Sequence, residues 1–133
     1  MIRTSDIANA LGQRLLTLDP ALPVAWPNKD LPAGTAHPYL IFDLAPVSRT
    51  DDTTTADAPI TRGFVQVAVM TKINSFASQG MSIAEDVAAL FPNGLKLTIT
   101  GGTLETGQAE VQDDGYPDGP HWRTPVRIPY MAY

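Results

Sequence analysis

The stretch Trp122-Arg-Thr-Pro-Val-Arg-Ile-Pro-Tyr130 decides the fold prediction for this chain. Its large apolar residues alternate with arginine and proline at a period of two, which is the side-chain period of a β-strand. Pro125 and Pro129 are four residues apart, so both remove backbone donors from the same side of that strand. We therefore expect an edge strand, or a strand whose pairing is irregular on that side.

Three earlier segments also predict extended structure. Residues 60–71 have the clearest pattern, with Val65, Val67 and Val69 on one face. Residues 38–45 are apolar on both faces except at Asp43, so we expect a central, covered strand. Prolines restrict residues 24–26 to a short extended piece, which we expect Trp26 to anchor by burying its ring. Weaker strand patterns cover residues 95–100 and 103–111.

Two segments have helical periodicity. The first carries apolar residues at helical spacing, and we expect Thr4 or Ser5 to cap it and Asp19-Pro20 to stop it. The second covers residues 75–91 and ends at Pro92-Asn-Gly94. The expected apolar faces are Ile7, Leu11, Leu15 and Leu18 in the first helix, and Met81, Ala84, Val87, Ala88 and Phe91 in the second.

This order of elements predicts an α+β fold, with a mostly antiparallel sheet and two helices packed on one face. The 133 residues fit a single domain spanning residues 1–133. Residues 48–58 join two strands, and we expect them to form the long exposed tip of a β-hairpin. Residues 113–120 read as a second exposed, acidic connector.

Composition narrows the function classes. The chain has no cysteine, which excludes thiolate metal sites and thiol nucleophiles. Its net charge is −5 with only 9 Lys and Arg, which argues against non-specific binding to nucleic acid or to an anionic membrane. No apolar run approaches the length of a membrane span, so we expect no membrane association.

No polar cluster has the spacing of a known catalytic or cofactor motif, so we predict no enzyme activity, no metal and no cofactor. His121 with Asp113, Asp114 and Asp118 is a candidate metal site, and the acidic residues of the 48–58 loop are a candidate calcium site. In both cases a solvated acidic loop is the favoured interpretation. For Trp26 and Trp122, packing within the protein is the favoured interpretation over a platform on which a ligand stacks.

Four segments together resemble a known family. They are Val24-Ala-Trp-Pro-Asn28 with the following Pro38-Tyr-Leu, the Gly63-Phe-Val-Gln-Val-Ala-Val strand, the helix ending Ala84-Glu-Asp-Val-Ala-Ala-Leu-Phe, and the stretch from Trp122 to Tyr130. In this order and spacing the chain resembles the tail terminator-like (minor tail) proteins of long-tailed bacteriophages and prophages. Many members carry a proline-glycine stretch before the second helix, and residues 71–76 depart from that pattern.

The resemblance implies a structural protein of the virion tail, assembled in the bacterial host cytoplasm. Such proteins form a hexameric ring that caps the head-proximal end of the tail tube, ends its polymerisation and offers a surface for head joining. The implied partners are further copies of the chain, the tail tube protein and a head-completion protein. DNA would pass through the lumen without specific binding.

We expect the partner contacts of such a ring to involve charged loop residues and the last strand. The 48–58 loop would be disordered in the free protein and would order against a tail or head partner. The candidate partner-interaction residues are Arg49, Asp51, Asp52, Asp57, Arg62, Arg123, Arg127 and Tyr133.

Three alternatives remain open at the level of sequence. Another head–tail connector, such as a head-closure protein, would also form a ring. A small enzyme or ligand-binding α+β domain would show a well-formed pocket with converging polar groups. A monomeric regulatory domain is the third, and the low positive charge argues against one that binds DNA.

Overall fold

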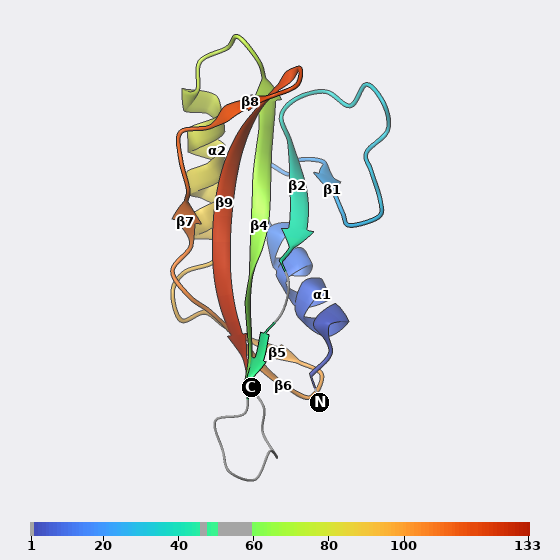
Figure 1. The fold of residues 1–133 in the computed structure, drawn as a ribbon, viewed down its shortest axis with the longest axis vertical. Coiled ribbons are helices and arrows are strands. Elements are labelled where there is room, and N and C mark those ends of the chain that lie inside the picture. Colours follow the sequence, from blue (N-terminus) through green and yellow to red (C-terminus); the bar gives the residue numbers. More distant parts are fainter. Residues whose placement is uncertain (1, 46–47, 51–59) are drawn as a thin grey trace.

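The computed structural model describes residues 2–45, 48–50 and 60–133 and shows an elongated α+β fold (Figure 1). Two helices and nine strands occur in these residues. In chain order they are α1 (Thr4–Leu15), β1 (Val24–Ala25), β2 (Tyr39–Leu44), β3 (Ser48–Thr50), β4 (Ile60–Lys72), α2 (Ser78–Ala89), β5 (Lys96–Ile99), β6 (Gly102–Thr106), β7 (Glu110–Val111), β8 (Tyr116–Asp118) and β9 (His121–Ala132).

The long antiparallel pair of β4 and β9 runs the length of the molecule. Its register is unbroken from Thr61 opposite Ala132 to Lys72 opposite His121. On the other side of β4, β2 and β3 pair with it one after the other, both antiparallel. β1 adds to β2 in parallel, so the sheet is mixed, with the order β1-β2-β4-β9-β6-β5.

The other side of β9 is paired only in pieces. β8, β7 and β6 each bond to a different part of it, all antiparallel. The carbonyls of Pro125 and Pro129 point to this side, where they accept hydrogen bonds from the backbone N–H groups of Gln112 and Gly107, at 3.0 and 2.8 Å. The two prolines offer no N–H in return, so no continuous ladder forms there. β9 is therefore irregularly paired on one side, as the proline spacing predicts, and the alternative of an edge strand is wrong.

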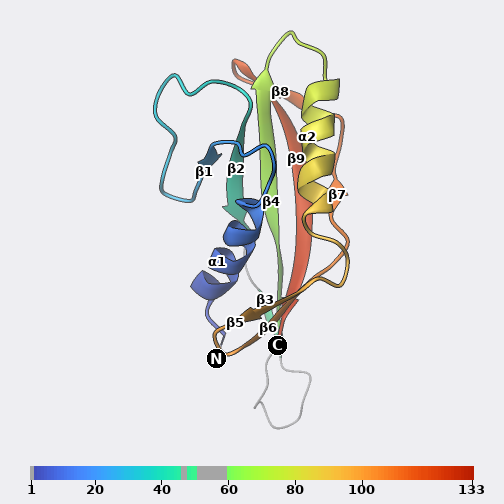
Figure 2. The ribbon, with the colours of Figure 1, turned by 180° about the vertical axis from the view of Figure 1, so that it is seen from behind.

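A single apolar cluster joins both helices to one face of the sheet. It contains Ile7, Leu11 and Leu15 of α1 and Ala84 and Val87 of α2. Figure 2 shows both helices in front of the sheet, with β4 visible between them. The sheet residues of this cluster alternate along β2, β4, β6 and β9, as one face of a strand requires: Leu40, Phe42, Val65, Val67, Val69, Leu104, Val126, Ile128, Tyr130 and Ala132.

The helix boundaries differ from the predicted ones. The N-cap of α1 is Arg3, whose carbonyl accepts the first helical bonds, and it makes no side-chain cap bond, so Thr4 and Ser5 lie inside the helix. α1 ends at Leu15, because tighter turns carry the chain on to Leu18 before Pro20 is reached. α2 is also shorter than predicted, at Ser78–Ala89.

Several strand predictions also need correction. β2 is buried on one face only, since Tyr39 and Ile41 are half-buried and Asp43 is exposed, so it is not covered on both sides. Residues 48–50 form β3 rather than loop, and the rest of the predicted 48–58 loop lies outside the described residues. Residues 103–111 form two strands, and the connector 113–120 contains β8. Among the described residues, neither helix is long and apolar enough to span a membrane.

Candidate interaction surface

Three of the predicted partner-interaction residues share the face of the sheet that points away from the helices. Arg62 on β4 is exposed and lies opposite Met131 of β9. Arg123 and Arg127 lie on β9, at even spacing from Met131, and therefore on the same face. We call this face, formed by β2, β4 and β9, the open face. The arginines run along it beside the apolar side chains of Phe64, Ala68 and Met70.

The contacts of Arg123 and Arg127 show how guanidinium groups are held on this face. The guanidinium of Arg127 lies over the ring of Phe64, with 4.0 Å from Cζ to the ring centroid, which is a cation–π geometry. Arg123 Nε donates a hydrogen bond to Asp118 Oδ2 at 2.9 Å, across the β8–β9 hairpin. Both contacts hold the arginine heads close to the strand, so the open face presents ordered cations.

The other predicted residues lie elsewhere. Arg49 is in β3, opposite Thr61 of β4. Tyr133 is 46% exposed, and its backbone pairs with Thr103 through two hydrogen bonds of 2.8 and 2.9 Å. Asp51, Asp52 and Asp57 lie outside the described residues. The structure thus brings together Arg62, Arg123 and Arg127, and sets Tyr133 at the opposite end of β9 from Arg123.

A pair of histidines that the sequence treated separately meets at one end of the sheet. His37 Nε2 and His121 Nδ1 are 2.7 Å apart, a distance at which one ring donates its N–H to the other. Tyr39 stacks on His37 with ring centroids 5.4 Å apart. Burial lowers the pKa of His37, and the nearby His121 and Lys72 lower it further. The pair lines a cavity of about 590 Å³ beneath residues 30–37.

The contact between His37 and His121 can be predicted only when the order of the strands in the sheet is known. His37 precedes β2, and His121 begins β9. Because β2 and β9 both run antiparallel to β4 on its two sides, their first residues meet at the same end of β4. The sequence signal was therefore a histidine at the entrance of each strand.

The candidate metal site at His121 does not assemble. Asp118 is engaged by Arg123, and Asp113 Oδ1 accepts a hydrogen bond from the Gly115 N–H at 2.6 Å. Within residues 2–45, 48–50 and 60–133, no three ligand side chains are placed to hold a metal ion. The second candidate, with Asp51, Asp52 and Asp57, lies outside the described residues.

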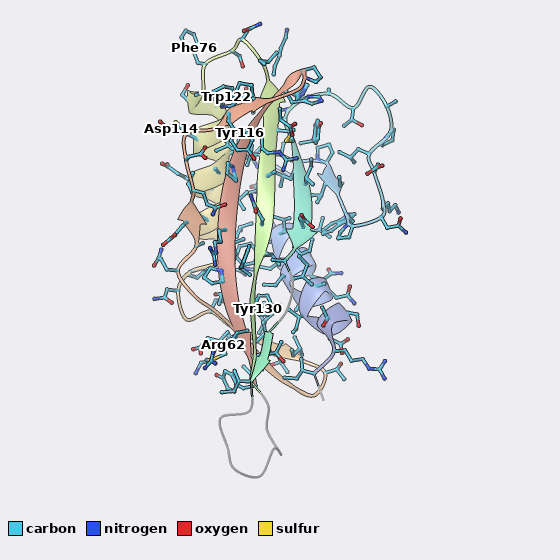
Figure 3. All side chains as sticks on the ribbon, viewed as in Figure 1. Arg62, Phe76, Asp114, Tyr116, Trp122 and Tyr130 are labelled. Carbon is cyan, nitrogen blue, oxygen red and sulfur yellow. The ribbon has the colours of Figure 1, made fainter. Side chains whose placement is uncertain are left out.

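The helix side carries two apolar features that sequence reasoning missed. Phe76, in the turn between β4 and α2, is 89% exposed (Figure 3). A cavity of about 320 Å³ opens between residues 18–22 and α2. Its lining is mostly apolar, and Asp19 and Asp86 are its charged members. The exposure of Phe76 could not be read from the sequence, because the helical pattern extends back to residue 75.

The described residues thus present two kinds of surface that are suited to contacts with other proteins, the open face with its arginines and the exposed apolar features of the helix side. The chain matches the family of the phage tail terminator protein over residues 6–130, and it belongs to that family. Family membership therefore gives this chain a structural role in a phage tail.

Solved structures show the same fold. One solved structure is 23% identical with a TM-score of 0.73, and the match covers 100% of this chain and 97% of that one. A chain from the virion of a native gene transfer agent particle is 16% identical with a TM-score of 0.69, covering 96% of this chain and 95% of that one. No curated protein sequence matches this chain.

Proposed function

We propose that this protein caps the head-proximal end of a phage tail tube, ends tube polymerisation and provides the surface for head joining. The observation that carries the proposal is the match to the tail terminator family, which covers residues 6–130 and therefore nearly the whole fold. The role needs no catalytic residue. It needs surfaces that recognise other proteins, and the open face with Arg62, Arg123 and Arg127 is one candidate.

The protein would act as a closed ring of identical copies, a hexamer, in the virion tail after assembly in the host cytoplasm. A ring requires a heterologous contact, in which two different patches of the same chain meet. One rim would contact the tail tube protein and the other a head-completion protein, with all of residues 1–133 acting as one unit. Acidic groups toward the lumen would let DNA pass without specific binding.

The experiment is to produce phage particles without this protein and measure tail length by electron microscopy. Loss of a terminator should give tails of variable and excessive length without heads, and supplying the protein in trans should restore one uniform length. Uniform tails that fail to join heads would instead indicate a head-closure protein and would overturn the capping role.

The interaction residues can be tested in the same system. Arg127→Glu reverses a charge on the open face without touching the buried core, because Arg127 is exposed. If this face contacts a tail or head partner, the variant should fold normally and yield fewer complete particles. Lys96→Glu, an exposed reversal on the edge strand β5, is the matched control and should yield normal particles.

A further inference from the structure

Phe76 is the most exposed large apolar side chain of the described residues. It is 89% exposed, and the next value is 53% for Leu16. The residue lies in the turn between β4 and α2, at the tip of the molecule, and its side chain points away from the body (Figure 3). A phenylalanine in this position forgoes the favourable free energy that burial of its ring would provide.

A matching cavity opens on the helix side of the same chain. Its volume is about 320 Å³. An apolar cavity of about 150 Å³ is enough to hold a benzene ring, so the space can take a phenylalanine side chain. The apolar lining consists of Leu18, Pro20, Leu22, Pro38 and Ile83. We call this cavity the α2 pocket, because Gln79, Ser82, Ile83 and Asp86 of α2 form one wall of it.

Charged residues of opposite sign belong to the two segments: carboxylates line the pocket, and a lysine precedes the Phe76 turn in sequence. Asp19 and Asp86 line the α2 pocket, and both are exposed. Lys72 is exposed at the end of β4, four residues before Phe76. Docking of the turn would bring the end of β4, which bears this lysine, toward the side of the pocket that carries two carboxylates, and opposite charges favour such an approach.

We propose that the Phe76 turn of one copy docks into the α2 pocket of a neighbouring copy. Phe76 does not fill the pocket of its own chain, because its side chain is almost fully exposed. The Phe76 turn and the α2 pocket are different patches of the same chain, so the contact is heterologous and can repeat from copy to copy until a ring closes. This inference rests on the proposed ring function and names the contact between its subunits.

The absence of cysteine in the chain makes crosslinking a direct test. One preparation carries Phe76→Cys, and a second carries Ser82→Cys in the wall of the pocket. The two are mixed and treated with a short bis-maleimide. The proposal predicts a strong crosslinked dimer in the mixture, well above the level given by Leu16→Cys mixed with Ser82→Cys. Leu16 is the exposed apolar control, and it lies directly after α1.

The double variant Phe76→Cys/Ser82→Cys tests the direction of the contact. A heterologous contact gives a ladder of crosslinked species that passes beyond the dimer. Products that stop at the dimer would indicate a two-fold contact and would overturn the proposal. So would crosslinking of Phe76→Cys to a different virion protein but not to Ser82→Cys, or a yield no higher than that of the Leu16→Cys control.

Association measured by light scattering provides the second readout. Phe76→Ser should weaken self-association at least about tenfold, because a buried aromatic ring is lost, while Leu16→Ser should leave it unchanged. Lys72→Glu and Asp86→Lys should each weaken it, and their combination in one chain should recover part of the loss, since the new charges again attract. If Phe76→Ser assembles like the unaltered protein while tails lacking the protein are still overlong, this contact is wrong and the terminator function stands.

Discussion

The two faces of the β4–β9 ladder are made by the same strands and yet differ in chemistry. The helix face is lined by branched apolar side chains such as Val67, Val126 and Ile128, all fully buried. The open face mixes Phe64 and Met131 with the exposed Arg62 and Arg127. The open face is not exposed throughout, since Ala68 and Met70 on it are buried, but the apolar cluster that includes the helices lies on the other face. The difference teaches that one face of the ladder carries this cluster, while the other has room for exposed residues that can serve recognition.

The largest expected effect comes from breaking the helix face. Ile128→Ala should lower the free energy of unfolding by about 2–5 kcal/mol, because it removes buried methyl groups and leaves a cavity beneath the helices. Met131→Ala is the matched control, since Met131 lies on the open face of the same strand and is only half-buried. Its cost should be about 1 kcal/mol. Chemical denaturation measures both, and equal losses would contradict the asymmetry of the two faces.

A second test concerns how closely α2 approaches the helix face. A Cβ at Gly80 would lie 2.7 Å from Thr124 Oγ1, and that hydroxyl is buried without a hydrogen-bond partner among the described residues. Gly80→Ala should therefore destabilise the protein by about 1–3 kcal/mol, although alanine is the better helix former. Thr124→Ala in the same chain should recover most of the loss in a denaturation experiment.

Gly12 of α1 is the matched control for Gly80. A Cβ there would lie 3.0 Å from the edge of the Trp26 ring, which is half-buried and can move aside. Gly12→Ala should thus cost less than Gly80→Ala. A Gly80→Ala protein that is more stable than the unaltered one would show that helix propensity outweighs close packing at this position.

The period-two pattern predicted the centre of the fold well, because β4 and β9 are long and one face of each is buried. The interruption by Pro125 and Pro129 was also predictable, since a missing donor acts locally. The position of β9 inside the sheet was not, because β6, β7 and β8 are short strands whose own sequences carry weak patterns. The start of α1 was missed because Arg3 caps this helix through its backbone alone.

The candidate site was only partly readable from the sequence. Alternation places Arg123 and Arg127 on one face of a strand, but their neighbour Arg62 required the β4–β9 register. The contact between His37 and His121 required the sheet order, since the two residues are 84 positions apart in the chain. The α2 pocket also combines segments distant in sequence, and no local pattern encodes such a cavity.

The cation–π contact on the open face should contribute less than any packing feature of the helix face. A double-mutant cycle with Phe64→Ala and Arg127→Ala should give a coupling free energy of about 0.5–1 kcal/mol, as expected for an exposed pair. Phe64→Leu is the control, because it keeps apolar bulk and removes the aromatic ring. If Arg127→Ala lowers the free energy of unfolding by as much in the Phe64→Leu protein as in the unaltered protein, the contact is apolar packing of the arginine stem.

The smallest expected effect is a dependence of stability on pH at the histidine pair. Because burial lowers the pKa of His37 below its usual 6.5, the unfolded chain binds a proton more readily than the folded one. The contribution of neutral His37 to the free energy of unfolding is thus complete above the pKa that His37 has in the unfolded chain. It is lost as the pH falls through the pKa that His37 has in the folded protein. Protonation of His37 would also leave its Nε2 able only to donate in the 2.7 Å contact. His37→Gln should flatten the change in thermal midpoint between pH 7.5 and pH 5.5, whereas an equally steep change in this variant would assign the effect to other groups.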